Sequence, residues 1–576
     1  MARRTFRGGV HPADKKALSR DSAFRRYEPG GLLVFPLGQH IGRPATAVVK
    51  KGDQVLAGQI IGEASGFISA NIISSCSGTV KAVEKHRTVM GIMAESVIIS
   101  NDGEYNKMPG IGEKVDYTKL DGKEIVQKVK DAGIVGLGGA GFPTNVKLSP
   151  KNADEIRYVI ANGAECEPYI TCDDQLMRTH ADEIVTGMKV MLRLFPNAKG
   201  VVVIEDNKSE AIAAMKEACA GSGDISVKVV PIKYPQGGER EIISVVAGID
   251  IKASQLPADA GCIVDNVATI YAIYKAVCES TPLMEKAVTI SGEAVAEPCN
   301  LIVPIGTLVS ELFDAAGGAK EGAAPVKVLS GGPMMGVALA TMEVPLQKNN
   351  NAFTFLAEDE VADAEKVQTA CIRCARCVHV CPLGLNPQMM AVAAERKDYE
   401  RYEKVLYGLE CISCGTCTFT CPAKRPLMQL FKEARNDIMA AKAVKRAEEA
   451  AASAALEKEA AQKRQAEIDA AVAAALRVRE PGKNLARASE AEQRLAAQSE
   501  AANSLDEKVE KKVRTAIKEA ELDMASNAKT TLGNKVSHAV RIDVADTSSE
   551  EKAIKKAKAK AAERRANAKA GKEDKE

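Results

Sequence analysis

The residues of this 576-residue chain best suited to chemistry are eight cysteines in two runs. The first run, residues 371–382, reads CIRCARCVHVCP, and the second, residues 411–422, reads CISCGTCTFTCP. Three thiolates spaced three positions apart on a tight loop can hold three irons of a [4Fe–4S] cubane, and a distant fourth thiolate can complete it. The two runs therefore predict two clusters that carry single electrons.

The spacing and the closing proline are those of bacterial two-cluster ferredoxins, in which the fourth cysteine of each run ligates the other cluster. A zinc site has no use for four cysteines in one run, and a disulfide framework suits small secreted domains rather than this long chain. Fifteen cysteines, eight of them in these runs, indicate a reducing compartment. The expected ligands are Cys371, Cys374, Cys377 and Cys421 for the first cluster, and Cys411, Cys414, Cys417 and Cys381 for the second.

A second candidate site is a glycine-rich segment, GIVGLGGAGFPT at 133–144, which follows apolar residues at helical spacing over 125–132. Gly136, Gly138 and Gly141 satisfy G-x-G-x-x-G, a pattern that needs a strand before it and a helix after it. Here a helix precedes and Phe-Pro follows, so an ordinary Rossmann turn is the poorer interpretation. Clustered glycines still let backbone N–H groups approach a phosphate or a flat ring.

The elements that must position this segment alternate between strand and helix, as in an α/β domain. Strands are expected at 156–161, 201–204, 227–232 and from 262, with helices at 209–220 and 269–278. Polar residues follow two of these strands, NGAECEP at 162–168 and Asp265-Asn266, where α/β folds commonly bind ligands. Asp265 and Asn266 could instead cap the helix at 269–278.

Short β-branched runs separated by glycine turns, from Leu32 to about Ser100, indicate a small β-barrel or sandwich. The phrase VKKGDQVLAGQ at 49–59 resembles biotinyl/lipoyl-type barrels, but the corresponding hairpin near Cys76 carries no lysine to modify. Cys76 is expected to be buried. Strands near 287–290, 299–303 and 326–329, with a helix at 307–316, indicate a compact α+β unit of the β-grasp kind.

Several function classes lack support in the composition. A net charge of +2 gives no electrostatic argument for nucleic acid, and no apolar run reaches the ~18 residues of a membrane span. No apolar region follows the basic start, so no signal peptide is expected. After about Asp437 the chain is rich in Ala, Lys and Glu, which predicts a disordered or transiently helical tail. Residues 552–572 hold nine basic residues and one acidic residue, as in a solvated tail or a contact with anionic lipid or a partner.

Five segments together carry a family resemblance: GLGGAGFPT (136–144), NGAECEPYIT (162–171), YPQGGE (234–239), DNVAT (265–269) and SGGPM (330–334). With the cysteine runs and the Ala/Lys-rich tail, the chain resembles the C-subunit family of Rnf-type ion-translocating NADH:ferredoxin oxidoreductases over about residues 5–435. Residues 120–345 are also similar to the NADH- and FMN-binding subunit of respiratory complex I, whose flavin fold is not a standard Rossmann domain.

The resemblance implies a multidomain α/β plus β fold class. Its parts are an N-terminal arm (1–30), a biotinyl/lipoyl-like barrel-sandwich domain without the modified lysine (31–115), a complex-I-like FMN/NADH α/β domain (116–283), a β-grasp, SLBB-like module (284–345), a two-cluster ferredoxin-like α-helical domain (365–435) and a low-complexity tail (436–576).

The resemblance also implies non-covalent FMN, NADH as substrate, and no catalytic acid or base. The residues expected near the flavin and dinucleotide are Gly136, Gly138, Gly139 and Gly141, Phe142 for stacking on adenine, Lys147 near the flavin phosphate, Asn162, Glu165 and Glu167 facing flavin and nicotinamide, Glu239, and Asp265, Asn266 and Thr269. Two features depart from complex I: Arg240 replaces the second of two adjacent acids, and two clusters replace one. Cys166 and Cys172 are expected to be buried or neutral.

The expected function is electron transfer from NADH through FMN and two clusters to membrane-embedded and iron–sulfur partner subunits. The implied location is peripheral, at the cytoplasmic face of the bacterial inner membrane, with association through partners and no role for nucleic acid. Two alternatives stay open: a component of a soluble ferredoxin-linked NAD(P)H dehydrogenase, or a flavin-free iron–sulfur relay adaptor.

Overall fold

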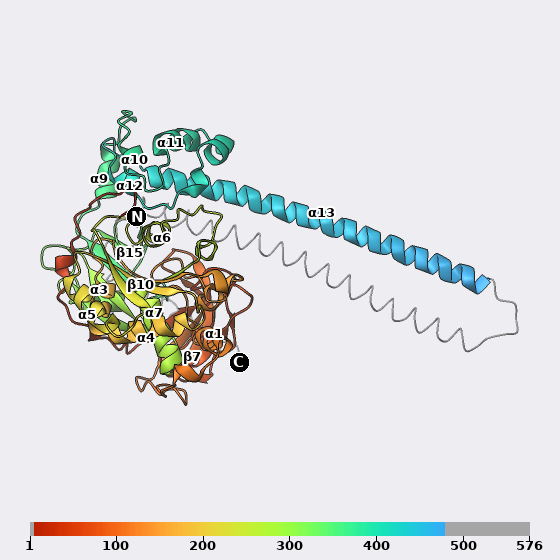
Figure 1. Ribbon diagram of the computed structural model, residues 1–576, viewed down its shortest axis with the longest axis horizontal. Coiled ribbons are helices and arrows are strands. Elements are labelled where there is room, and N and C mark those ends of the chain that lie inside the picture. The colour runs from red at the N-terminus through yellow and green to blue at the C-terminus, as the bar shows by residue number, and fades with distance from the viewer. Residues whose placement is uncertain (1–4, 478–576) are drawn as a thin grey trace, which may run out of the picture. The chain divides into compact units, whose positions relative to one another are not determined.

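The computed structural model describes residues 5–477 (Figure 1). Its described part divides into two compact units, one holding the chain up to Met389 together with Glu410–Met428, the other holding Met390–Leu409 and the chain from Gln429 onward. All eight cysteines of the two runs lie in the first unit. Across residues 5–477, no helix is both long and apolar enough to span a bilayer. The expectations for the basic run at 552–572, and for the rest of the tail after 477, lie outside the described residues.

The first domain is a sandwich of two antiparallel sheets. One contains β2 (Leu32–Pro36), β8 (Met93–Asn101), β7 (Gly78–Arg87) and β4 (Gln54–Val55), and the other contains β3 (Thr46–Ala47), β5 (Ile60–Glu63) and β6 (Ile72–Ile73). Residues Leu33, Phe35, Ile61, Ile72 and Ile99 form one buried cluster from strands of both sheets. Cys76 is buried in the same cluster, as predicted. The predicted barrel or sandwich is therefore confirmed.

The α/β domain is built on a four-stranded parallel sheet in the order β11 (Ile225–Val230), β10 (Lys199–Glu205), β9 (Tyr158–Gly163), β12 (Cys262–Asn266). Alternate side chains of each strand enter different cores, as the period of two requires. Val159, Val202 and Ile204 pack with α1 (Gly122–Asp131), α4 (Ala181–Leu192), α5 (Ser209–Cys219) and α7 (Val267–Cys278), whereas Ile160 and Val203 pack with α6 (Glu239–Ala247). Both faces are therefore covered, as parallel sheets require (Figure 1).

The glycine segment lies between two helices. Helix α1 begins with a capping box, in which Asp121 accepts from the Glu124 amide and Glu124 accepts from the Asp121 amide. No strand separates α1 from the glycines; the loop is closed by a hydrogen bond from the Gly136 amide to the Phe142 carbonyl (2.9 Å), and α2 (Thr144–Lys147) follows. The predicted helix is confirmed, and the loop is not an ordinary Rossmann turn.

A six-stranded mixed sheet follows, in the order β1 (Arg25–Arg26), β14 (Cys299–Pro304), β13 (Glu285–Ser291), β17 (Ala352–Leu356), β15 (Lys327–Ser330), β16 (Val337–Ala338), with α8 (Val309–Ala315) between β14 and β15 in sequence. Two of its strands lie outside the expected range 284–345. Strand β1 comes from the N-terminal arm and pairs in parallel with β14, Arg25 opposite Leu301. The arm also contains the 3₁₀ turn η1 (Lys16–Leu18).

The two cysteine runs adopt matching backbone conformations. Arg373 and Ser413, at equivalent positions, have φ of 58° and 55°, and Ala375 and Gly415 have φ of 58° and 80°. A short helix then follows in each run, α10 (Arg376–His379) and α12 (Thr416–Phe419). Repeated left-handed residues form the tight loop that three neighbouring ligands need. Helix α9 (Glu360–Lys366) precedes the first run, and α11 (Pro387–Glu395) follows it.

The second unit is helical. Its main element is α13 (Leu427–Arg477), whose start belongs to the first unit, and the π-helical turn Arg401–Val405 lies before it in sequence. Tyr402 of this turn is buried with its ring centroid 6.3 Å from that of Phe431, and Tyr399 donates a hydrogen bond to Asp437. The part of the expected tail that the structure describes, up to residue 477, is thus helix.

Candidate functional site

The structure brings the eight thiols into two groups of four. Burial raises the pKa of Cys377, and the neighbouring thiols that raise it further are Cys421, Cys371 and Cys374. Burial likewise raises the pKa of Cys417, followed by effects of Cys411, Cys414 and Cys381 and a smaller one of Cys377. The fourth cysteine of each run therefore lies beside the first three of the other run.

The thiols differ in their access to solvent. Cys371 and Cys374 are exposed, whereas Cys381, Cys414 and Cys417 are buried. Burial raises the pKa of Cys414 to about 12, so that its metal-free thiol is protonated at neutral pH. Iron ligands must be deprotonated, and metal binding there would have to release protons. Two sets of four thiols on tight loops are a donor set that fits two [4Fe–4S] clusters.

The acidic loop after β9 is built around Glu165, whose side chain is 2% exposed. Its carboxylate accepts hydrogen bonds from the amides of Asp173 (2.7 Å) and Asp174 (3.3 Å), in the first turn of α3 (Cys172–Thr179). Burial raises the pKa of Glu165 to about 8, although Lys16 and Lys208 oppose this shift. Glu165 thereby anchors the loop to the helix that follows it.

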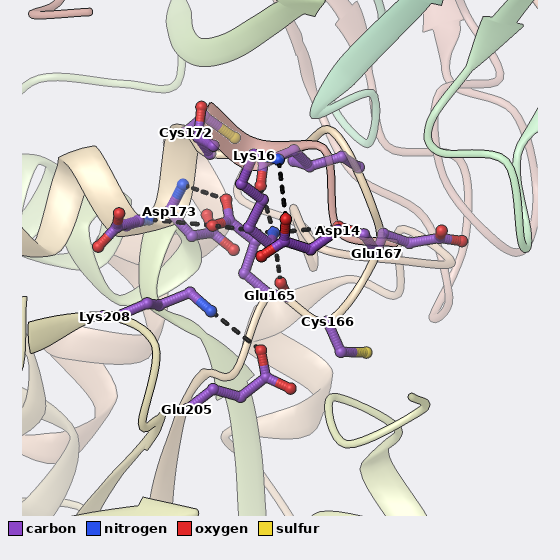
Figure 2. Close-up of polar contacts among 12 residues, drawn as sticks. Asp14, Lys16, Glu165, Cys166, Glu167, Cys172, Asp173, Glu205 and Lys208 are labelled. Carbon is purple, nitrogen blue, oxygen red and sulfur yellow. Dashed lines mark hydrogen bonds and ion pairs between the residues drawn. The ribbon is translucent and has the colours of Figure 1, made fainter. Parts of the chain in front are cut away.

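Lys16, from the N-terminal arm, lies against this loop with its side chain 3% exposed (Figure 2). Its Nζ atom donates to the carbonyls of Glu165 (2.8 Å), Glu167 (3.0 Å) and Ile170, and lies 3.8 Å from the Glu165 carboxylate. This residue was not predicted from the sequence. Nothing in the polar, basic arm distinguishes Lys16 from its neighbours, because its partners lie about 150 residues away.

A buried ion pair supports the other side of the loop. Lys208 donates to the Ala164 carbonyl at 2.7 Å and to the Glu205 carboxylate at 3.0 Å (Figure 2). Glu205 ends β10, and Lys208 precedes α5. This pair was also missed, since a Lys three residues after a Glu is an ordinary pattern. The loop that holds Glu165 and Glu167 is thus fixed by two buried lysine side chains, Lys16 and Lys208.

Glu167 contacts the end of the SGGPM segment (330–334). Its carboxylate accepts from the amides of Met334 (3.2 Å) and Met335 (2.6 Å), at the end of the SGGPM segment. Burial raises its pKa to about 7. Glu167 therefore joins the acidic loop to residues 330–335. Cys166 and Cys172 flank these contacts, and burial raises the pKa of each, so that both are neutral thiols as predicted.

The carboxyl ends of β9 and β12 bring two asparagines opposite each other, Asn162 and Asn266. Asn266 caps α7 by accepting from the Ala268 amide (2.8 Å), and its Nδ2 donates to Asp173 (2.6 Å). The capping role is thus confirmed for Asn266. A Cβ atom on Gly138 would lie 2.8 Å from the Asn266 side chain, so glycine is required there.

The glycine loop is attached to the same edge through Thr269, whose buried hydroxyl accepts from the Leu137 amide at 3.0 Å. Gly138 and Gly139 are exposed, and no heavy atom lies within 4 Å of the position of a Cβ on Gly139. Phe142 is half-buried at the end of the loop. An open glycine backbone at the carboxyl edge of a parallel sheet fits a bound planar group with a phosphate.

A second polar group at this edge contains Lys147, Asp265 and Glu239. The Lys147 ammonium lies 3.2 Å from Asp265 and 3.6 Å from Glu239, and donates to the Val264 carbonyl at 2.6 Å. Burial opposes the charge of Lys147, but Asp265 and then Glu239 outweigh it and raise its pKa. Burial raises the pKa of Asp265. The expected residues Lys147, Glu239 and Asp265 are therefore in contact.

Glu241, in the first turn of α6, allows a test of how burial affects stability. Its side chain is buried, and burial raises its pKa from 4.5 to about 7. The folded chain therefore binds more protons than the unfolded chain between about pH 4.5 and 7, and stability falls as pH rises through this window. We expect Glu241→Gln to be more stable than the parent above pH 7 by roughly 2–3 kcal/mol, with the gain vanishing near pH 4.5.

Thermal unfolding of the anaerobic protein at several pH values between 5 and 8 would measure this difference. Glu217→Gln, a change at an exposed position of α5, is the matched control and should leave the pH dependence unchanged. Parallel pH profiles for Glu241→Gln and the parent would contradict the expectation.

Four family models match separate parts of the chain. They are the RnfC barrel sandwich hybrid domain at 4–104, the Nuo51 FMN-binding domain at 129–275, the SLBB domain at 287–338 and the 4Fe-4S dicluster domain at 370–426. The glycine loop and the polar edge lie in the FMN-binding match, and all eight cysteines lie in the dicluster match. FMN and [4Fe–4S] clusters are therefore the cofactors these domains support.

Similar proteins extend over most of the chain. The C-subunit of the proton-translocating ferredoxin:NAD⁺ oxidoreductase complex of Clostridium ljungdahlii is 38% identical over 438 residues, which are 76% of this chain and 95% of that one. The Na⁺-translocating counterpart from Acetobacterium woodii is 36% identical over 436 residues, 76% of this chain and 97% of that one. A solved NAD⁺-reducing [NiFe]-hydrogenase aligns over 52% of this chain and 57% of its own at 23% identity, with a TM-score of 0.40, too low to establish a common fold.

Proposed function

Because the chain belongs to the C-subunit family of Rnf-type ion-translocating ferredoxin:NAD⁺ oxidoreductases, we propose that it exchanges electrons between NADH and the other subunits of such a complex. It is an oxidoreductase subunit with FMN-binding and dicluster domains. The observation that carries the proposal is that an open glycine loop and two groups of four thiols occur in one compact unit.

Bound FMN would accept a hydride and release electrons singly. The chain's own residues would bind the flavin and orient it. Gly138 and Gly139 offer an exposed backbone, with the half-buried Gly136 and the buried Gly141 in the same loop. Phe142 lies at the end of the loop, and Lys147 supplies a positive charge balanced by Asp265 and Glu239. Asn162, Glu165, Asn266 and Thr269 hold the loops at the carboxyl edge of the sheet, and Glu167 fixes the acidic loop to residues 334–335. No side chain is required as acid or base.

The eight thiols would hold the two clusters in the crossed arrangement expected from their spacing. We propose that electrons pass through them to membrane-embedded and iron–sulfur partner subunits, and that the chain associates with the cytoplasmic face of the membrane through those partners. We propose domain boundaries near residues 30, 115, 283, 365 and 435, with the module that begins at 284 extended past 345 to include β17 (Ala352–Leu356).

An anaerobic ultraviolet–visible spectrum before and after NADH tests this function. We expect a flavin band over a broad iron–sulfur absorbance, both bleached by NADH. Iron–sulfur absorbance without a flavin band, unchanged by NADH, would support the flavin-free relay adaptor instead. Recovery of the native protein only in the soluble fraction, with NADH-dependent bleaching intact, would favour the soluble dehydrogenase.

A further inference from the structure

We propose that the segment Tyr234–Arg240 positions the cluster of Cys381, Cys411, Cys414 and Cys417 relative to the flavin site, and that Arg240 makes this contact instead of binding the dinucleotide. The inference rests on the proposed function and names positioning residues for its electron-transfer step. That step moves one electron from reduced flavin to an oxidised cluster and makes or breaks no bond to the protein.

Arg240 is directed at the residue before the second cysteine run. Its side chain is 17% exposed, its Nη2 lies 2.8 Å from the Glu410 carboxylate, and its Nη1 donates to the Glu410 carbonyl at 3.0 Å. Its Nε donates to the Ile251 carbonyl at 2.7 Å. The Glu410 carboxylate also accepts from the Ala253 amide at 2.7 Å. One guanidinium therefore joins α6, residues 251–253 and the peptide that leads into Cys411.

The position of Arg240 in its helix supports this role. It occupies the first turn of α6, where the helix dipole disfavours a cation. The two acids beside it, Glu239 and Glu241, suit that turn. The planar fork of the arginine holds a carboxylate and two carbonyls, and these contacts offset the unfavourable position.

Tyr234 makes a second connection to the same cluster segment. Its buried hydroxyl donates to the Cys414 carbonyl at 2.8 Å. Its backbone pairs with Val10 through two hydrogen bonds of 2.9 Å, and the adjacent Gly9 amide donates to the Val380 carbonyl at 2.8 Å. The peptides beside Cys381, Cys411 and Cys414 are thus all linked, directly or through the N-terminal arm, to this one segment.

The middle of the segment contacts the flavin site. The Gly237 carbonyl accepts from Asn162 at 2.9 Å, the Gly237 amide donates to the Cys166 sulfur at 3.2 Å, and Glu239 lies 3.6 Å from Lys147. The seven residues 234–240 therefore contact the flavin-site side through Asn162, Cys166 and Lys147, and the second cysteine run through Glu410 and Cys414. Electron transfer depends steeply on separation, so a segment that fixes the separation controls the rate.

The test uses the full-length holoprotein under anaerobic conditions and follows flavin and cluster bleaching separately after rapid mixing with NADH. We expect Arg240→Ala and Glu410→Ala each to slow cluster reduction by on the order of tenfold, as loss of precise placement does elsewhere. The NADH concentration that half-saturates flavin bleaching should not change. The double variant should be slower by less than the product of the two single effects, because the two substitutions share the Arg240–Glu410 contact.

Two further readouts do not depend on activity. Hydrogen exchange at the Ala253 amide should accelerate in Glu410→Ala, and iron content should equal that of the parent. Lys366→Ala, which breaks the exposed Lys366–Asp363 pair, is the matched control and should change none of these quantities. Tyr234→Phe removes only the hydroxyl that contacts Cys414. If Arg240→Ala loses iron, the cluster-reduction rate of Tyr234→Phe tests the proposal instead.

One contrary result is that Arg240→Ala raises the half-saturating NADH concentration while cluster reduction still follows flavin bleaching at the parental rate. That result would make Arg240 a nucleotide contact and overturn the proposal. Parental cluster-reduction rates in Arg240→Ala, or in Tyr234→Phe where the first variant loses iron, would also overturn it. Absence of NADH bleaching in the parent would refute the proposed function instead, and exchange at Ala253 would still report the contact.

Discussion

Cys381→Ser will lose about half of the protein's iron, and the iron it loses will be that bound by the other cysteine run. Cys381 ends the first run, yet its thiol lies with Cys411, Cys414 and Cys417. A buried serine hydroxyl is a poor iron ligand, so the cluster completed by Cys381 should not assemble stably. Iron and acid-labile sulfide contents measure the loss, and paramagnetic resonance of the reduced protein counts the remaining clusters.

Pairs of substitutions distinguish crossed from uncrossed ligation. If the crossed arrangement holds, Cys381→Ser combined with Cys411→Ser retains half of the iron, because both remove the same cluster. Cys381→Ser combined with Cys371→Ser loses nearly all of it. The opposite pattern would mean that each run binds its own cluster. Cys219→Ser, a buried cysteine of α5 away from both runs, is the control and should keep all of the iron.

Lys16→Met has the second large expected effect. Methionine matches the length of the lysine stem but leaves three carbonyls and the Glu165 carboxylate without their cation. Hydrogen bonds to a charged group contribute about 1.5–3 kcal/mol each. Part of this loss is offset, because the substitution also removes the cost of burying an ammonium group. The same burial lowers the pKa of Lys16. We expect a net loss of about 3 kcal/mol and a lowered flavin content, since the acidic loop loses its support.

Thermal unfolding and the flavin-to-protein ratio measure the effect. Lys15→Met is the matched control: Lys15 is the preceding residue, but its side chain is 49% exposed in an ion pair with Glu293 at 3.5 Å. Exposed pairs contribute at most about 1 kcal/mol, so this variant should behave like the parent. Equal behaviour of the two variants would show that the contacts of Lys16 do not stabilise the loop.

The sequence predicted those parts of the fold that depend on local patterns. Helix α1, the alternation of strand and helix from β9 to α7, and the N-terminal sandwich all have periodic apolar residues or turn signals within a few positions. The unusual surroundings of the glycine loop were also predictable, because a helix before it and Phe-Pro after it can be recognised locally.

Contacts between distant segments could not be predicted in this way. Strand β1 has only two residues, both exposed, so it has no apolar pattern to recognise. Lys16 and Lys348 are buried lysines that donate mainly to backbone carbonyls, and a carbonyl leaves no trace in the residue type. Arg240 was recognised only as a departure from a related pattern, and its contact with Glu410 became visible only in the structure.

The pairing of β1 with β14 also constrains when the chain can finish folding. Arg25 lies opposite Leu301, and Val10 pairs with Tyr234, so neither β1 nor Val10 has its pairing partner when it leaves the ribosome. At about 5–20 residues per second, synthesis of the missing strand takes on the order of ten seconds to a minute. Strand β1 must stay unpaired during that interval. The polar, basic composition of the arm suits a segment that stays exposed to solvent until its partner strand is synthesised.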